Sequence, residues 1–409
     1  MKKWGVLLAA VAMVGGLSAC EQVKQVAADA AGLPTDDNVL FWTQDQRDNA
    51  FRQMENLTTT RTISAGEQSY DMAAGEPLEL GTWAGDNGKQ WNLTQYMMDQ
   101  RAAGIIVLHN GKIRLEEYSL DYAADGRWTS FSVAKSFVST LVGAAVQDGY
   151  IESLDDPLTK YIPELEGSGY DGVTVEQLLT MTSGVKWNED YTDPESDVAK
   201  FNLTKSQDGD NPILTYMAKL EREAEPGTRW QYNTGETNLI GVLVSKATGK
   251  TLAEYLSEKV WAPYGMQMDA EWILNDGGFE IGGCCISASL RDYALLGQFV
   301  AGGGVADGKQ VVPEGWFTKA GTKQADIGVP GQGYGYQWWT YDDGSFTARG
   351  IFGQSIFIDP GRQLVIATSG NYPDATDERL SLERNRFFRA VQAAIDSESV
   401  MDKAIMEGE

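Results

Sequence analysis

The sequence contains a single histidine among its 409 residues, and this scarcity restricts the catalytic chemistry more than any other feature. A Ser-His-Asp triad would have to use His109, which precedes the Asn110-Gly111 turn signal and is expected at an exposed strand end. Zinc sites that use histidine and two-histidine iron sites are excluded by the same count. The Gly-x-Ser-x-Gly motif of the nucleophile elbow is absent too. A hydrolase with this sequence therefore needs a base other than histidine.

Basic residues are also few, with 33 Lys and Arg against 58 Asp and Glu and a formal net charge of -25. A surface this acidic repels phosphate backbones, and no polybasic segment is present to bind an anionic membrane, so nucleic acid is excluded as a partner. Residues 248–251 (Thr-Gly-Lys-Thr) have the end of a phosphate-binding loop but lack its leading glycine. We therefore expect no nucleotide, no metal ion and no other cofactor.

Only three cysteines are present, and their spacing excludes a metal-binding cysteine motif. Cys284 and Cys285 are adjacent in a Gly-Gly-Cys-Cys-Ile-Ser segment. We expect two small, buried, unpaired residues in a tight segment. A disulfide between these neighbours is the alternative, which an oxidising compartment would permit.

The third cysteine lies in an N-terminal segment that predicts export. Lys2 and Lys3 precede an apolar run at 4–14, which is too short to span a membrane and has the layout of a secretory signal. Leu-Ser-Ala-Cys follows at 17–20. This run resembles a bacterial lipobox, and an ordinary signal peptide with a chance cysteine is the alternative.

The lipobox resemblance implies a signal peptide at 1–19, a lipid on Cys20 and a tether at 20–37. Glu21 follows the cysteine, which favours the outer membrane of a Gram-negative bacterium, with the protein facing the periplasm. The remainder, 38–409, has a globular composition, since 42% of the chain is hydrophobic and 22% charged. Its length fits one large domain of two lobes or two small domains, and we expect one domain.

Apolar runs predict strands near both ends of the chain with helices between them. A buried strand at 104–108 and a returning strand at 113–118 flank the hairpin turn, and a strongly apolar, central helix follows at 132–147. Further strands are expected at 335–341, 347–350, 355–359 and 364–369, and a last amphipathic helix at 377–395. We therefore predict an α+β fold: one antiparallel sheet built from both chain ends, flanked by helices, with a helical lobe inserted at about 155–285.

A serine and a lysine at the start of the central helix suggest a catalytic pair. Ser132 and Lys135 are three residues apart, so their side chains share one helix face, and burial would lower the pKa of the lysine. The Ser-x-x-Lys pattern is weak alone, because Ser183 and Lys186 repeat it in a turn-like setting. On this pattern alone, a capping serine beside a snorkelling lysine explains the first copy equally well.

Several further motifs favour the catalytic interpretation. In chain order the motifs read Ser-Phe-Ser-Val-Ala-Lys-Ser (130–136), Leu-Leu-Thr-Met-Thr-Ser-Gly (178–184), Pro-Gly-Thr (226–228), Tyr-Asn-Thr (232–234), Ser-Leu-Arg-Asp-Tyr (289–293) and Gly-Gln (353–354). Together they resemble the class C β-lactamase-like serine hydrolases, which include D-aminopeptidases, DD-peptidases, esterases and 6-aminohexanoate-oligomer hydrolases. The resemblance covers about residues 95–370 and implies a β-lactamase/transpeptidase-like fold.

The same resemblance implies roles for individual residues. Ser132 is the expected nucleophile, and Lys135 and Tyr232 together are the expected general base, which later protonates the leaving group. A free phenol has a pKa of about 10, but a neighbouring ammonium stabilises its phenolate, so the pair can share one proton. The backbone N–H groups of Ser132 and Ile351 would form the oxyanion hole.

The third family motif departs from its usual form. Where the family commonly has Lys-Thr-Gly or His-x-Gly on an edge strand, this chain has Ala348, Arg349 and Gly350. In β-lactamases that lysine helps to hold the substrate carboxylate, so its absence weakens an assignment to β-lactams. Gly350 would let the strand approach the substrate closely.

Within this family, the sequence most resembles the subgroup of 6-aminohexanoate-dimer hydrolases and their esterase relatives. Their loop over the site resembles residues 187–191, where Tyr191 either touches the leaving amine or is simply an exposed aromatic. Tyr191, Arg349 and Gly350 are the expected substrate-binding residues. Four aromatics suggest an apolar pocket, although core packing explains some of them: Tyr334, Tyr336, Trp338 and Trp339.

Three hypotheses about function follow. The first is a serine hydrolase that cleaves small carboxylic esters or linear amides through an acyl-enzyme on Ser132. The second keeps this chemistry but acts on D-Ala peptides or β-lactams, against which the missing Lys-Thr-Gly counts. The third is a catalytically idle, wall-binding lipoprotein.

Overall fold

The computed structural model describes residues 32–36, 38–207 and 209–407. The expected signal peptide, Cys20 and most of the expected tether lie outside the described residues. In the described part of the chain, no helix is both long enough and apolar enough to cross a membrane.

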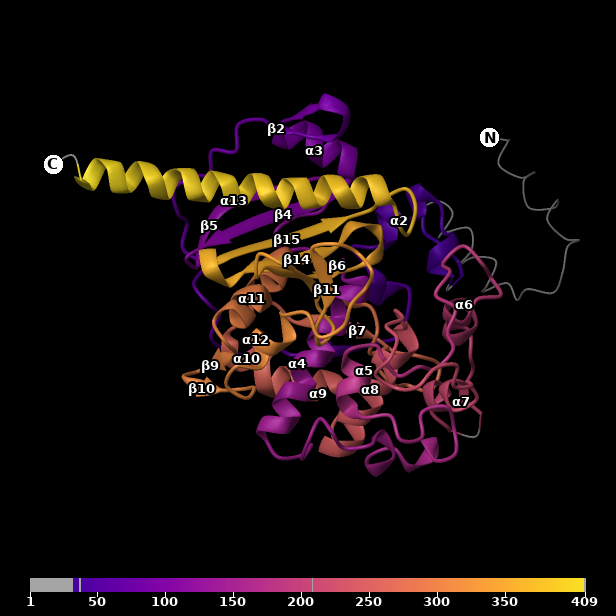
Figure 1. The fold of residues 1–409 in the computed structure, drawn as a ribbon. Helices are drawn as coiled ribbons and strands as arrows, with labels where there is room; N and C mark the ends of the chain where they lie inside the picture. Colours follow the sequence, from indigo (N-terminus) through magenta and orange to yellow (C-terminus); the bar gives the residue numbers. More distant parts are fainter. Residues whose placement is uncertain (1–31, 37, 208, 408–409) are drawn as a thin grey trace, which may run out of the picture.

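A seven-stranded antiparallel sheet lies at the centre of the fold (Figure 1). Its strands are β4 (Ala102–His109), β5 (Lys112–Tyr118), β11 (Gln332–Tyr334), β12 (Trp339–Tyr341), β13 (Phe346–Arg349), β14 (Ser355–Asp359) and β15 (Leu364–Gly370). Their order is β11-β12-β13-β14-β15-β4-β5. β15 pairs with β4, with Ile366 opposite Val107, so the two halves of the chain meet inside the sheet as predicted.

The hairpin between β4 and β5 follows from its turn residues. Asn110 (φ 50°) and Gly111 (φ 73°) both adopt the left-handed conformation that a tight hairpin requires. His109 ends β4 as expected, but it is half-buried, since its ring contacts the side chains of Asn110 and Arg114.

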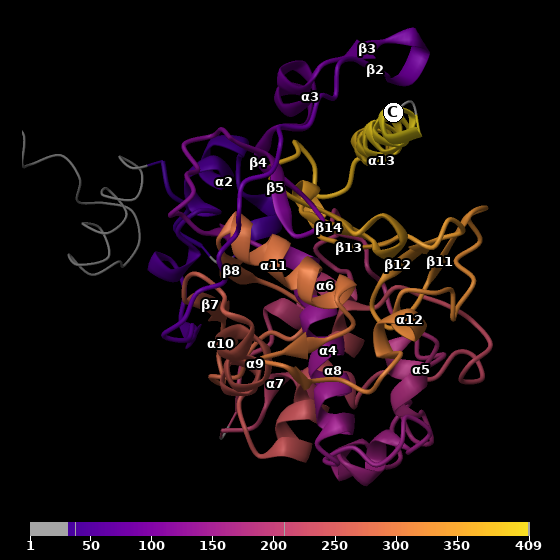
Figure 2. The ribbon, with the colours of Figure 1, turned by 90° about the vertical axis from the view of Figure 1, so that its left-hand side faces the viewer.

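Helices cover both faces of the sheet (Figure 2). On one face, α13 (Glu378–Glu407) and α3 (Leu93–Gln100) enclose an apolar cluster that includes Phe357 of β14 and Phe388 of α13. On the other face, α11 (Leu290–Ala301) packs on β14 and β15. The larger core beneath it includes the buried residues of α4 (Ala134–Gln147). The sheet therefore separates two apolar cores.

The helical part of the chain is built around α4, which packs against α8 (Thr234–Thr248). The shorter helices include α5 (Val175–Leu179), α6 (Asp197–Asn202), α7 (Pro212–Met217), α9 (Leu252–Leu256), α10 (Ala262–Tyr264) and α12 (Trp316–Ala320). A second sheet, in the order β1-β7-β8-β6, joins β1 (Thr60–Ile63), β6 (Trp128–Thr129), β7 (Ala270–Ile273) and β8 (Ile286–Ala288). This second sheet was not predicted from the sequence.

Some expected boundaries were wrong. Of the strand expected at 335–341, only 339–341 is a strand, β12, because the chain turns at Gln337 (φ 64°) between β11 and β12. The last helix continues well beyond residue 395, to Glu407. The helix expected from Ser132 begins with one turn of 3₁₀ helix, η4 (Phe131–Val133), before α4.

Candidate active site

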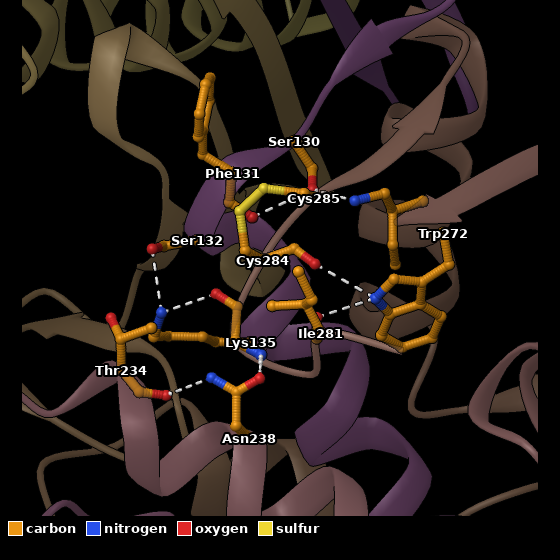
Figure 3. Close-up of a disulfide and its surroundings, with 12 residues drawn as sticks. Ser130, Phe131, Ser132, Lys135, Thr234, Asn238, Trp272, Ile281, Cys284 and Cys285 are labelled. Carbon is orange, nitrogen blue, oxygen red and sulfur yellow. Dashed lines mark hydrogen bonds between the residues drawn. A yellow bond between two sulfur atoms is a disulfide. The ribbon is translucent and has the colours of Figure 1, made fainter. Parts of the chain in front are cut away.

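Ser132 and Lys135 lie at the junction of η4 and α4. The Lys135 Nζ donates to the Ser132 Oγ at 3.0 Å (Figure 3). Ser132 is partly exposed, whereas the Lys135 side chain is only 1% exposed. Phe131, just before the serine, has φ 44°, a conformation that non-glycine residues adopt at a cost and that is common at functional sites. The hydroxyl is therefore held against a lysine that solvent does not reach.

The surroundings of Lys135 favour its neutral form. Burial lowers the pKa of the ammonium to about 8, although the negative charge of Glu189 opposes this fall. Its second partner is a backbone carbonyl, the Gly283 oxygen at 2.7 Å, which adds no countercharge. A buried lysine with a depressed pKa can accept the proton of a neighbouring hydroxyl.

Tyr232 lies just before α8 and close to the lysine. The Lys135 Nζ is 5.3 Å from the centre of its ring. Burial raises the pKa of the phenol, Glu189 raises it further, and Ser132 and Arg349 oppose the rise. Ser132, Lys135 and Tyr232, which the motifs predicted as one site, are thus brought together.

The strand that carries the third motif passes directly against the nucleophile turn. A Cβ atom at Gly350 would lie 2.6 Å from the Ser130 carbonyl oxygen and 3.2 Å from the Phe131 Cβ, so only glycine fits here. Ile351 follows at the start of a 3₁₀ turn, η8 (Ile351–Gly353). Among the described residues, the backbone N–H groups of Ser132 and Ile351 have no acceptor, so both can donate to a ligand.

Glu189 is a site residue to which the sequence analysis gave no role. Its carboxylate accepts hydrogen bonds from the Thr234 N–H at 2.9 Å, from the Tyr191 hydroxyl at 2.6 Å and from the Trp187 Nε1. It thereby joins the 187–191 loop to the N-terminus of α8, beside Lys135. An acidic residue in a loop gives no sequence signal for this position.

Arg349 lies beside the aromatic residues of the site. Its guanidinium is 4.9 Å from the centre of the Trp339 ring, which stacks on Tyr232 with ring centres 5.5 Å apart. The Arg349 Nη2 donates to the Tyr341 hydroxyl at 2.8 Å, whereas its Nε is buried and has no hydrogen-bond partner among the described residues. No ion pair within the described part of the chain includes this arginine. A cation with spare donors is therefore present near Tyr232.

Most of the aromatics expected to line an apolar pocket belong to the core. Tyr334, Tyr336 and Trp338 are fully buried, and the Tyr336 hydroxyl bonds to Glu176, away from the Ser132 site. Trp339 is partly exposed and stacks on Tyr232, and the buried Tyr334 contacts Tyr232 edge-on.

Cys284 and Cys285 form a disulfide in the structure, so the expectation of two unpaired cysteines was wrong (Figure 3). The pair lies next to the site: the Cys285 N–H donates to the Phe131 carbonyl at 3.3 Å, and Gly283, the acceptor of Lys135, directly precedes it. On the other side of the disulfide, the Trp272 Nε1 donates to the Cys284 carbonyl at 3.1 Å. The disulfide is therefore part of the wall of the site.

In the described part of the chain, no group of three or more His, Cys, Asp or Glu side chains is arranged to hold a metal ion.

Comparison with known proteins gives one matching family model, Beta-lactamase, over residues 92–390. The 6-aminohexanoate-dimer hydrolase of Paenarthrobacter ureafaciens is 32% identical over 363 residues, which cover 84% of this chain and 90% of the relative.

Among solved structures, a Bacillus anthracis protein with the provisional name 6-aminohexanoate-dimer hydrolase has a TM-score of 0.77 at 24% identity, covering 88% of this chain and 98% of its own. A class C β-lactamase has a TM-score of 0.57 at 17% identity, covering 75% and 93%. A family VIII carboxylesterase has a TM-score of 0.55 at 19% identity, covering 71% and 92%. These structures share the fold of this chain.

Proposed function

Since the chain belongs to the beta-lactamase family and is a serine hydrolase, we propose that it cleaves small linear amides or carboxylic esters through an acyl-enzyme on Ser132. One observation carries the proposal: the Ser132 Oγ lies 3.0 Å from the Nζ of a buried lysine whose pKa is lowered to about 8.

The proposed reaction begins with transfer of the Ser132 proton to neutral Lys135 as the Oγ attacks the substrate carbonyl. The Ser132 and Ile351 N–H groups stabilise the oxyanion that forms. The lysine ammonium, with the Tyr232 hydroxyl beside it, returns the proton to the leaving amine or alcohol. A water molecule then attacks the acyl-enzyme by the same route, and free Ser132 is regenerated.

A linear amide with charged ends is the substrate class that we favour. The relative with 32% identity over most of both chains is a 6-aminohexanoate-dimer hydrolase, and such a dimer carries an ammonium and a carboxylate. Arg349, with its unpaired Nε, would bind the carboxylate, and Gly350 would let the β13 strand lie along the substrate. Tyr191 would contact the leaving amine from the 187–191 loop.

The alternative substrates are β-lactams and D-Ala peptides. The fold shared with a class C β-lactamase favours them, but Ala348 stands where the family commonly has a lysine.

We also propose that Cys20 carries a lipid that anchors the protein to the outer membrane, on the basis of the Leu-Ser-Ala-Cys run alone. Palmitate labelling that is equal in wild type and Cys20→Ser would contradict this.

The test of function is Ser132→Ala, assayed on p-nitrophenyl esters of graded length, a linear 6-aminohexanoate dimer and nitrocefin. We expect turnover to fall by roughly four orders of magnitude or more, with an unchanged circular dichroism spectrum. A fluorophosphonate probe should label the wild type and not the variant, and equal labelling would refute the assignment of Ser132. Lys135→Ala should be comparably inactive, whereas Lys186→Ala, in the second Ser-x-x-Lys copy, should remain active because Lys186 is exposed.

A further inference from the structure

A small cavity with polar and apolar lining lies between α13 and the end of β15, away from Ser132. It has a volume of about 10 Å³, and the residues around it include Gln100, Gly353, Ser369, Gly370, Tyr372 and Arg384. This volume admits one small species, such as a water molecule or a monatomic ion.

Arg384 is a buried cation without a countercharge. It is 4% exposed and forms no ion pair within the described residues. Its Nε is buried and has no hydrogen-bond partner among these residues. The other arginines of α13 behave differently. Arg379 pairs with Asp99 at 2.9 Å, and Arg386 pairs with Asp86 at 3.3 Å. An isolated buried charge is costly unless an opposite charge or strong dipoles compensate it.

The neighbouring carboxylates are already engaged. The Glu383 carboxylate accepts from the Trp91 Nε1 at 2.7 Å and from the Asp86 N–H at 2.8 Å. Asp99 pairs with Arg379 and with Lys89. Among the described residues, Arg384 therefore has no carboxylate as an ion-pair partner.

The other free polar groups around the cavity are donors. The Gln100 Oε1 accepts from the Tyr372 hydroxyl at 2.7 Å, and its Nε2 is buried with no partner among the described residues. The Ser369 Oγ is buried and unpartnered in the same part of the chain. A guanidinium N–H, an amide N–H and a hydroxyl around one small space form a donor set suited to an anion.

We propose that this cavity binds one small monovalent anion of the size of chloride, with Arg384 supplying the charge. The wall of the cavity is the turn that follows Ile351. Tyr372 packs against Gly353, where a Cβ would lie 2.5 Å from the Tyr372 ring, and the Thr368 Oγ1 donates to the Gly353 carbonyl at 3.1 Å. The bound anion therefore braces the turn that carries the Ile351 N–H. The effect on catalysis rests on the proposed function, whereas anion binding does not.

The test measures thermal unfolding of the full-length protein at constant ionic strength while sodium chloride replaces sodium gluconate, whose anion is too large for the cavity. We expect the Tm of the wild type to rise saturably with chloride by about 3 °C. Arg384→Gln should lose this response. Arg379→Gln should keep it, because Arg379, which is also in α13, is exposed and already paired with Asp99 of α3. Identical unfolding in the two salts, or an equal chloride response in Arg384→Gln, would overturn the proposal.

A bromide-soaked crystal of the wild type provides a test that does not depend on any variant. An anomalous peak beside Arg384 is expected, and water alone in the cavity would refute the site. Turnover measured in the same two salts separates the two claims. A Tm response without a change in kcat supports the anion site but refutes its bracing of the Ile351 turn. Loss of all hydrolysis in both salts would refute the proposed function and leave the anion site standing.

Discussion

Burial acts in opposite directions on the two side chains that are candidates for the base. It lowers the pKa of Lys135 to about 8, because the charged ammonium loses its solvation. It raises the pKa of Tyr232, because the charged form of a phenol is the deprotonated one. At neutral pH a larger fraction of Lys135 than of Tyr232 is therefore deprotonated and able to accept a proton. We assign proton acceptance to Lys135 and a hydrogen-bonding role to Tyr232, instead of equal shares in one base.

This assignment predicts the pH dependence of the reaction. Protonated Lys135 cannot accept a proton, so kcat/KM should rise with pH and level off above an apparent pKa of about 8. Glu189→Gln should shift the profile to lower pH, because the Glu189 charge raises the pKa of Lys135. Initial rates from about pH 6 to about pH 10 measure both profiles. A rate that is still rising at about pH 10, with no plateau, would instead indicate the phenol as the base.

At the residue scale, the sequence was most informative where a motif exists. Ser132, Lys135 and Tyr232 were predicted because their spacing and motif context are specific. Glu189 was not, since its position depends on which segments meet in three dimensions. The Cys284–Cys285 disulfide was only the alternative, because adjacency in the sequence does not decide whether two cysteines pair. A carboxylate that bonds to a residue 45 positions away leaves no local pattern.

At the scale of elements, the site depends on the close approach of β13 to η4. Gly350→Ala would place a methyl group 2.6 Å from the Ser130 carbonyl and push the strand away from the nucleophile turn. We expect kcat to fall at least about tenfold, because oxyanion stabilisation requires correctly placed donors.

The matched control for Gly350→Ala is Gly361→Ala, where the new Cβ would meet only the Asp359 Oδ1 at an ordinary 3.4 Å. Steady-state kinetics on the best ester or amide substrate should show this control to be active. An active Gly350→Ala would mean that β13 does not position the oxyanion hole.

Element prediction succeeded where hydrophobic runs were long. The strands β4, β14 and β15, with 5 to 8 residues, were located close to their true bounds. The second sheet was missed because its strands have only 2 to 4 residues, too few for a period of two to stand out. Tertiary pairing, with Arg61 opposite Trp272, forms that sheet.

At the scale of the whole molecule, the central sheet separates the site from the smaller of the two apolar cores. Ser132 and Lys135 belong to the side of α4 and α8, whereas α13 packs on the opposite face (Figure 2). Phe388 of α13 is 1% exposed and stacks on Phe357 of β14, with ring centres 4.5 Å apart. Stability and activity should therefore be separable by substitutions on the α13 face.

Phe388→Ala tests this separation. Removal of a buried aromatic ring typically costs about 3–5 kcal/mol, so the free energy of unfolding in urea should fall by that amount while KM at moderate temperature stays unchanged. Leu382→Ala is the control on the same helix, and it should cost less than about 1 kcal/mol because Leu382 is 49% exposed. If Phe388→Ala instead raised KM as strongly as a change in the site, the sheet would transmit strain between the two cores, and the α13 face would have to be counted as part of the catalytic scaffold.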